Sequence, residues 1–211
     1  MDICFGARPL RPTRNLDLGD EQVLVERCRR EDPEAFAKIV DAYQGRVFGF
    51  VRKMVRDPDE AADVAQDVFI RAFQSFKRFD GRSSLRTWLF KIAHNLCIDR
   101  SRRRERSLHE TSLEPPVDED AEWDLPDTRW DPETMAVDGE FMGVIDKGIE
   151  GMSEKLRSVL LLHDREDMAY EEIASVLELP LGTVKSRLFL ARAHLHGVIQ
   201  AYLNQEAKAY E

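Results

Sequence analysis

The chain has 211 residues, of which 43% are hydrophobic and 34% are charged, and its formal net charge is −9. This balance excludes a disordered chain and favours a helix-rich globular protein with one medium domain or two small ones. It also disfavours strong unaided binding to duplex DNA, because phosphate contacts dominate such binding and usually require a basic protein. The longest apolar runs, such as Val159–Leu162, are far too short to span a bilayer.

The three cysteines, Cys4, Cys28 and Cys97, are widely spaced and odd in number. They provide neither a disulfide framework nor a CxxC metal site. The first residues, MDICFGARPLRPTR, contain no apolar signal core. We therefore expect a cytoplasmic protein without membrane insertion, in which residues 1–19 form a flexible tail.

A first helix is predicted to begin near Asp20 and to lead to Asp32. Asp32-Pro33-Glu34 then has the pattern of an N-cap followed by proline at the first helical position. The helix that follows carries apolar residues at helical spacing, which predicts one buried face. These residues are Phe36, Ile39, Val40, Tyr43, Val47, Phe50, Val51 and Met54.

Asp57-Pro58-Asp59-Glu60 repeats the same helix-start signal. The next helix is predicted to bury Ala62, Ala65, Phe69, Ala72, Phe73 and Phe76. Its opposite face carries Asp63, Gln66, Asp67, Ile70 and Gln74. An exposed isoleucine among carboxylates and amides suits docking on a basic partner surface. An ordinary solvated face with one stray isoleucine is the alternative.

Phe73–Arg104 is predicted to contain the end of that helix, a short loop at Arg78–Ser84 and a further helix with a basic tail. In the further helix Leu85, Leu89, Ile92 and Leu96 form an apolar stripe. Trp88, Lys91, Asn95 and Arg102 lie about a quarter turn away. An aromatic ring, an amide and cations together can hold unstacked bases and their phosphates. The alternative is an amphipathic helix with a half-buried tryptophan and a solvated basic end.

An acidic segment separates two mildly basic parts of the chain. From Glu110 to Glu140 there are twelve acidic residues and one arginine. Four prolines fall in the same part of the chain, so residues 107–137 are predicted to form an extended linker. The predicted domains are residues 20–106 and 138–205.

The second domain contains a predicted helix-turn-helix. Ser153 is the expected N-cap of one of its helices. Further along, Tyr170–Leu177 is a short helix, Glu178–Leu181 a turn, and the second helix begins around Gly182–Thr183. In this second helix Val184, Leu188, Ala191, Leu195 and Val198 are predicted to face the core, whereas Ser186 and Phe189 point outward beside Lys185, Arg187 and Arg192. An outward phenylalanine among cations is typical of a helix that reads the DNA major groove. A helical hairpin whose phenylalanine meets another subunit is the alternative.

Two stretches of the sequence resemble the extracytoplasmic-function sigma factors of the bacterial sigma-70 superfamily. DVAQDVFIRAFQSFKRFDGRSSLRTWLFKIAHNLCIDRSRRR resembles the second conserved region of that family, and YEEIASVLELPLGTVKSRLFLARAHL resembles its fourth. The resemblance covers Glu21–Arg104 and Asp138–Leu203. It implies an all-α fold of two small helical domains joined by the acidic linker.

The resemblance also implies a function. The chain would be an alternative sigma factor that binds the clamp and flap of core RNA polymerase, recognises the minus-ten and minus-thirty-five promoter elements, and promotes DNA melting. The acidic linker would follow the template-strand and RNA-exit channels, and an anti-sigma factor would hold the protein inactive. No catalytic residue, cofactor or metal is implied.

The family motifs assign candidate residues to three surfaces. The residues matched to minus-ten DNA are Phe79, Asp80, Gly81, Arg82, Ser83, Trp88, Lys91, Asn95, Arg102 and Arg103. Those matched to minus-thirty-five DNA are Thr183, Lys185, Ser186, Arg187, Phe189 and Arg192. Those matched to the polymerase clamp are Asp63, Gln66, Asp67, Ile70 and Gln74. The chain departs from the family at Leu190, where members often carry a basic residue.

Two other classes of protein compete with this interpretation. A two-domain regulator that binds operator DNA would need a sensor pocket or phospho-acceptor site in its N-terminal half. No pattern there predicts a pocket, and Phe73–Arg104 would remain unexplained. An enzyme is disfavoured because the five histidines form no HExxH or His/Cys cluster, and no GxxxxGK[ST] or GxSxG motif occurs.

Overall fold

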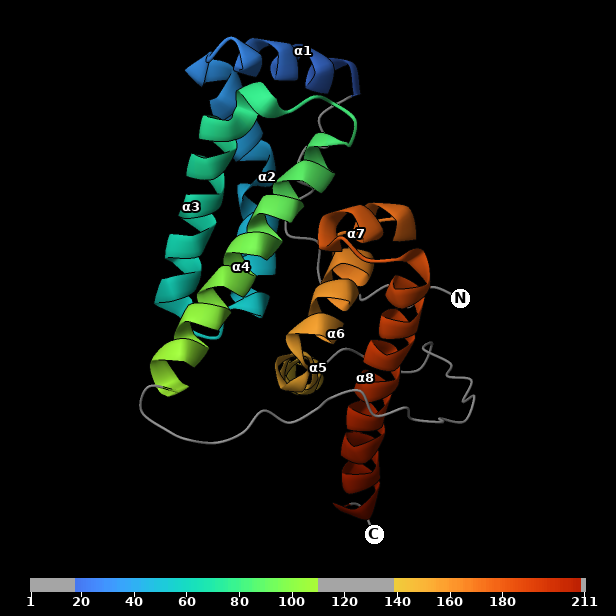
Figure 1. The fold of residues 1–211 in the computed structure, drawn as a ribbon. Coiled ribbons are helices and arrows are strands. Elements are labelled where there is room, and N and C mark those ends of the chain that lie inside the picture. Colours follow the sequence, from blue (N-terminus) through green and yellow to red (C-terminus); the bar gives the residue numbers. More distant parts are fainter. Residues whose placement is uncertain (1–17, 110–138, 210–211) are drawn as a thin grey trace.

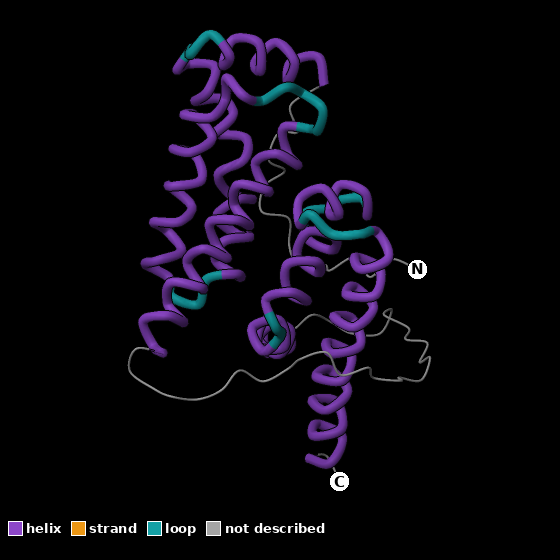
Figure 2. The backbone as a smooth tube through the Cα atoms, viewed as in Figure 1, coloured by secondary structure: helices purple, strands orange, loops and turns teal. Residues whose placement is uncertain are grey.

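The computed structural model describes residues 18–109 and 139–209, and every regular element in these two ranges is helical (Figures 1 and 2). The expected all-α fold is confirmed. The first range contains α1 (Leu18–Arg29), α2 (Pro33–Met54), α3 (Pro58–Ser75), the 3-10 turn η1 (Phe76–Arg78) and α4 (Leu85–His109). The second contains α5 (Gly139–Gly151), α6 (Glu154–Leu160), the π-helical turn η2 (Leu161–Arg165), α7 (Tyr170–Leu177) and α8 (Leu181–Ala209).

The two Asp-Pro signals start helices as predicted. Asp32 Oδ1 accepts hydrogen bonds from the N–H groups of Glu34 and Ala35 at 3.0 and 3.3 Å. Asp57 caps α3 in the same way, through the N–H groups of the second and third residues after it. The proline that follows each aspartate loses no hydrogen bond, because the first N–H groups of a helix have no partner within the helix.

The apolar stripe of α2 is buried as predicted, with Val40 only partly covered. The prediction for α3 was wrong at Ala62 and Phe73, which are exposed. The buried row of α3 is instead Ala61, Val64, Ala65, Val68 and Ala72. These small side chains let α3 lie close to α2 and α4, and Phe73 is left at the edge, with its ring centroid 5.0 Å from that of Phe36.

The C-terminal half is organised around α8. Val184, Leu188, Ala191 and Leu195 are buried as predicted, whereas Val198 is partly covered and Ile199 takes the next core position. Ser153 occupies the N-cap position of α6, but its hydroxyl makes no capping hydrogen bond.

Arg157 is a buried cation that joins the two halves of the fold. Its guanidinium donates to the carbonyl oxygens of Ile149, Glu150 and Met152 at 2.6–3.0 Å, all at or just after the end of α5. It also donates to the carbonyl oxygens of Lys53 and Met54, at the end of α2, at 3.3 and 3.5 Å. The carbonyl groups at two helix ends are therefore satisfied by one side chain.

The two halves pack against each other, with α4 beside α7 and α2 beside α5 and α6 (Figure 1). Helix α4 continues to His109 and α8 to Ala209, beyond the predicted domain ends at 106 and 205. The predicted tail, except for its last two residues, and most of the predicted linker lie outside the described residues. None of the described helices combines the length and the apolar run that a membrane span requires.

Candidate nucleic-acid interface

The loop from Phe79 to Ser84 is tied to a distant helix at its first residue and contains a local turn. Arg29 of α1 donates through Nη2 and Nε to the carbonyl oxygen of Phe79, at 2.8 and 3.1 Å. Gly81 has a φ of +76°, a left-handed conformation that glycine adopts without steric cost. The Arg82 N–H donates to Asp80 Oδ1 at 3.1 Å. The loop therefore presents Asp80, Gly81 and Arg82 to solvent.

The first residue of this loop packs into an aromatic cluster. Phe79 is only 5% exposed, and its ring centroid lies 5.8 Å from that of Phe76 and 5.1 Å from that of Trp88. Trp88 is partly buried. Phe79 was predicted to contact minus-ten DNA, but its buried ring is not available to a base in this structure. The Phe79 ring instead anchors the loop to the core.

The flank of α4 beside the loop carries the other predicted minus-ten residues. On this flank Asn95, Arg102 and Arg103 are exposed, and in the loop Ser83 is partly covered. Lys91 is partly exposed, and its Nζ lies 2.7 Å from Glu178 Oε1 in the turn of the helix-turn-helix. Except for Phe79 and the partly covered Ser83, Trp88 and Lys91, the minus-ten candidates are exposed, and Lys91 has an acidic partner.

Two further cations adjoin this surface. Arg71 and Arg78 line a hollow of about 420 Å³ together with Asn95 and Ile92. Neither arginine was among the predicted site residues. Arg71 lies on α3 and Arg78 on η1, so helical periodicity alone does not bring them together.

The helix-turn-helix is formed as predicted by α7, a turn and α8. Glu178 ends α7 with a φ of 55°, and Phe189 is 58% exposed on α8. Lys185 and Ser186 are exposed beside it, whereas Thr183 and Arg187 are partly covered. The Lys185 Nζ lies 5.9 Å from the centroid of the Tyr170 ring, within the range of a cation–π contact.

Arg192, predicted to contact minus-thirty-five DNA, instead turns toward η2. Its guanidinium donates to the carboxylate of Asp164, which is 5% exposed, and lies 3.2 Å from His163 Nδ1. The His163 ring stacks on Tyr170 with 5.1 Å between the ring centroids. Arg192 in this structure therefore positions α8 against η2.

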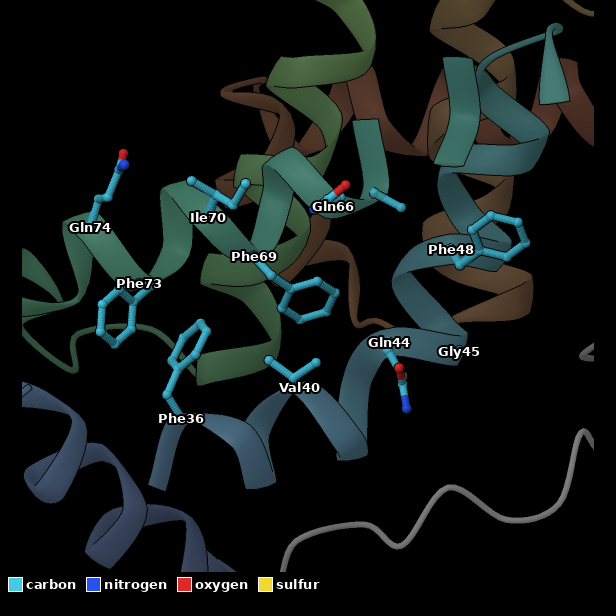
Figure 3. A pocket seen from close by; sticks show the side chains of 11 residues that line it. Phe36, Val40, Gln44, Gly45, Phe48, Gln66, Phe69, Ile70, Phe73 and Gln74 are labelled. Carbon is cyan, nitrogen blue, oxygen red and sulfur yellow. The ribbon is translucent and has the colours of Figure 1, made fainter. Parts of the chain in front are cut away.

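An apolar groove runs between α2 and α3 on the predicted polymerase face (Figure 3). Its volume is about 830 Å³, and Phe48, Ile70 and Phe73 line it with 43–45% of each residue exposed. Gln66 and Gln74 form part of its wall, and Figure 3 shows the rings of Phe36 and Phe73 side by side in its lining. The other predicted clamp residues, Asp63 and Asp67, are exposed on α3. Exposed aromatic and aliphatic side chains beside polar ones are typical of a protein-docking surface.

Metal or thiol chemistry has no geometric support in the described residues. No three histidine, cysteine, aspartate or glutamate side chains gather there in a way that could hold a metal ion. Burial raises the pKa of the Cys28 thiol to about 11 and that of the Cys97 thiol to about 12. Both side chains behave as small core residues.

Comparison with known proteins shows which class of protein this fold defines. The family model for Sigma-70 region 2 matches residues 39–107, and the model for Sigma-70 region 4 matches residues 143–195. The chain is 35% identical to the RNA polymerase sigma-H factor of Pseudomonas aeruginosa, over 88% of this chain and 96% of that protein. It is 32% identical to the ECF RNA polymerase sigma-E factor of Escherichia coli, over 88% of this chain and 97% of that protein.

The chain therefore belongs to the sigma-70 family of RNA polymerase sigma factors. Its relatives place it in the extracytoplasmic-function group, as an alternative sigma factor for promoter recognition and transcription initiation. It is a recognition subunit and not an enzyme.

Solved structures share the fold. The sigma factor RpoE of Bartonella quintana, in complex with the anti-sigma factor NepR, has a TM-score of 0.61 and 22% identity over 78% of this chain and 96% of that one. CnrH, in complex with the cytosolic domain of CnrY, has a TM-score of 0.62 and 22% identity over 86% of this chain and 97% of that one. At this identity the likeness concerns the fold alone.

Proposed function

We propose that the loop Phe79–Ser84 and the adjoining flank of α4 bind the single-stranded minus-ten element. Flipping a base out of duplex DNA costs a few kcal/mol. The exposed amide of Asn95 and the cations Lys91, Arg102 and Arg103 offset this cost, because they can bind base edges and phosphates that an unstacked strand presents. Because the loop is anchored at Phe79 before DNA binds, less conformational entropy is lost on binding.

The recognition helix α8 would bind the minus-thirty-five element as a duplex. The observation that carries this proposal is the 58% exposure of Phe189 on a helix whose neighbouring Lys185 and Ser186 are also exposed. An apolar ring can contact a thymine methyl group, while cations and hydroxyl groups bind phosphates and base edges. Arg187 and Thr183 lie at the edge of this face.

The groove between α2 and α3 would bind the clamp of the largest polymerase subunit. Ile70, Phe73 and Phe48 would bury apolar surface on a partner helix, and Asp63 and Asp67 beside it would pair with basic side chains. Binding to polymerase fixes the distance between the two DNA-binding domains. Two DNA contacts that are each weak then act together, and the complex selects promoters that carry both elements at that spacing.

Location and regulation follow from the same function. A subunit that works on chromosomal promoters acts in the cytoplasm. The related RpoE structure contains the anti-sigma factor NepR, which supports the proposal that a protein of this kind also restrains the present chain. The domain limits are proposed at 20–106 and 138–205, with the acidic segment between them acting in the polymerase channels.

The experiment that tests the function compares promoter binding with and without core RNA polymerase. The free chain is expected to bind a promoter duplex weakly at moderate salt, and core polymerase is expected to produce specific, stable complexes. Phe189→Ala and Lys185→Ala should each weaken protection of the minus-thirty-five element in footprints while leaving the assembly with polymerase intact. Tight and specific binding by the isolated wild-type chain would count against the proposal and favour an operator-binding regulator.

A further inference from the structure

A π-helical turn ahead of the helix-turn-helix holds two polar side chains away from solvent. In η2 the Glu166 N–H donates to the carbonyl oxygen of Leu161, five residues earlier in the chain, at 3.1 Å. Turns of this kind are rare and often occur at functional sites. The side chains of His163 and Asp164, both in η2, are 18% and 5% exposed. Neither residue belongs to a predicted site, so the turn calls for a physical reason.

Asp164 is the centre of a polar network that includes α8. Its Oδ1 accepts hydrogen bonds from Arg192 Nη2 at 2.5 Å and from His163 Nδ1 at 2.7 Å. The His163 nitrogen is the donor in this pair, because an ionised carboxylate can only accept. Arg192 Nε lies 3.5 Å from Oδ2, so the guanidinium meets both oxygens of the carboxylate. Charge-assisted contacts with this two-point geometry orient a side chain firmly.

A second route connects the same carboxylate to the recognition face of α8. The His163 ring stacks on the Tyr170 ring, with 5.1 Å between the ring centroids and 28° between the planes. Tyr170 is the first residue of α7, and Lys185 Nζ lies 5.9 Å from the centroid of its ring. Asp164 is therefore linked to α8 at two points, Arg192 and Lys185.

The two points of attachment define the rotation of the recognition helix about its axis. Lys185 and Arg192 are separated by seven positions, which is about two turns and about 10.5 Å along the helix. They lie on nearly the same side of α8, and Phe189 lies about 40–60° around the helix from each of them. A binding surface works only when its side chains are held within about 0.5 Å and 10–20° of the productive geometry. Rotation of α8 after loss of an attachment would move Phe189 outside this range.

We propose that Asp164 is a positioning residue for minus-thirty-five recognition, which holds α8 in register through Arg192 and through the stacked rings of η2 and α7. The inference deepens the proposed function and rests on it, because it assumes that α8 reads the minus-thirty-five element. Arg192, which the family resemblance matched to DNA, then acts through Asp164 instead of contacting a phosphate.

The experiment measures binding of the holoenzyme, formed from the full chain and core polymerase, to two duplex promoter fragments. One fragment comes from a promoter that the wild-type holoenzyme transcribes, and in the other the minus-thirty-five element is scrambled. The ratio of the two affinities is the minus-thirty-five preference. Asp164→Asn should lower this preference about tenfold, which corresponds to the loss of one good base contact. Equal loss of affinity for both fragments would indicate general destabilisation of the domain and would overturn the proposal.

Arg192→Lys distinguishes positioning from direct contact with DNA. Lysine keeps the charge and can bind a phosphate, but its ammonium group cannot reproduce the two-point geometry of a guanidinium. Positioning therefore predicts a lower preference for Arg192→Lys, whereas direct contact predicts a preference close to that of the wild type. Positioning also predicts that Arg192→Gln leaves the slope of log affinity against log salt concentration unchanged. A slope reduced by about 1 would reveal a lost phosphate contact and refute the proposal.

A double variant tests whether the two residues act together. Asp164→Asn combined with Arg192→Gln should lose no more preference than the weaker-binding single variant, because both changes break the same contact. Additive losses would contradict the proposal. Glu171→Gln is the matched control, since it removes a carboxylate charge at an exposed position on α7 and should leave the preference within about twofold. Equal losses in Glu171→Gln and Asp164→Asn would remove any special role of Asp164.

Failure of the proposed function gives a different result from failure of this inference. A wild-type holoenzyme without any minus-thirty-five preference would refute reading by α8 and, with it, the positioning role. A wild-type preference that Asp164→Asn leaves intact would refute the positioning role alone.

Discussion

The Phe79 ring packs against Trp88 with 5.1 Å between the ring centroids, so a residue of the predicted DNA-binding loop belongs to the core. The contact couples the loop to α4, since Trp88 lies on the first turn of that helix. The shape of the proposed DNA-binding loop and the stability of the first domain therefore depend on the same aromatic cluster.

Phe79→Ala should lower the free energy of unfolding by about 3–5 kcal/mol, as is usual when a buried phenylalanine is truncated. The matched control is Asp80→Ala, which changes an exposed neighbour and should alter stability by about 0.5 kcal/mol or less. Urea unfolding followed by circular dichroism measures both. Equal stability of the two variants would show that the Phe79 ring does not anchor the loop.

Lys91→Ala combined with Asn95→Ala should reduce open-complex formation about tenfold or more, because two polar contacts to the unstacked strand are lost. Permanganate reactivity of promoter thymines measures the melting. Binding of the variant to core polymerase should be unchanged, since both residues lie on α4, away from the groove between α2 and α3. Unaltered melting would show that this flank does not hold the minus-ten strand.

Ile70→Glu should weaken binding to core polymerase about tenfold or more, because it puts a charge into the exposed apolar groove. The fold should be unaffected, since Ile70 is 45% exposed. Val23→Glu is the control, because Val23 is 61% exposed on α1 and does not line the groove. Equal affinity of the two variants for polymerase would remove the groove from the interface.

The two buried thiols should resist alkylation in the folded protein. Their pKa values are raised from 9.0 to about 11 and about 12, so little thiolate of Cys28 or Cys97 forms at pH 8. In a Cys4→Ser variant, iodoacetamide should react at least about a hundredfold faster in urea than in buffer. Fast alkylation of the native protein would contradict the burial of these side chains.

The same pKa shifts set a dependence of stability on pH. Because the folded pKa values lie above the unfolded value, the contribution of these thiols is fully present below pH 9.0. It is lost progressively as the pH rises from about 9 toward 12, where the unfolded chain gives up protons that the folded chain retains. Replacement of both thiols by alanine should remove this part of the alkaline decline.

Local signals could be read from the sequence, whereas contacts between distant segments could not. The Asp32 and Asp57 caps depend on groups two and three residues away, so each Asp-Pro pair predicts its helix start directly. The burial of Phe79 depends on α4, and the exposure of Phe73 depends on how closely small residues let α3 approach its neighbours. Hydrophobicity alone does not distinguish these two rings.

In the candidate site, too, local features were predicted from the sequence, whereas contacts between distant segments were not. Periodicity predicted that Phe189 points outward, and the resemblance placed Lys91 and Asn95 beside the loop. Neither the periodicity nor the resemblance predicted that Glu178 pairs with Lys91 or that the Arg192 guanidinium binds Asp164. Both contacts join residues far apart in the sequence, and their pairing depends on how the helices dock in three dimensions.

We infer that the two helical domains recognise promoters selectively when RNA polymerase holds them at a fixed separation. The most direct measurement is run-off transcription with the purified chain, bacterial core polymerase and a genomic promoter library. The account predicts a stable assembly and transcripts that start at a specific set of promoters sharing minus-ten and minus-thirty-five elements. The absence of a stable assembly, or starts no different from those of core polymerase alone, would contradict it.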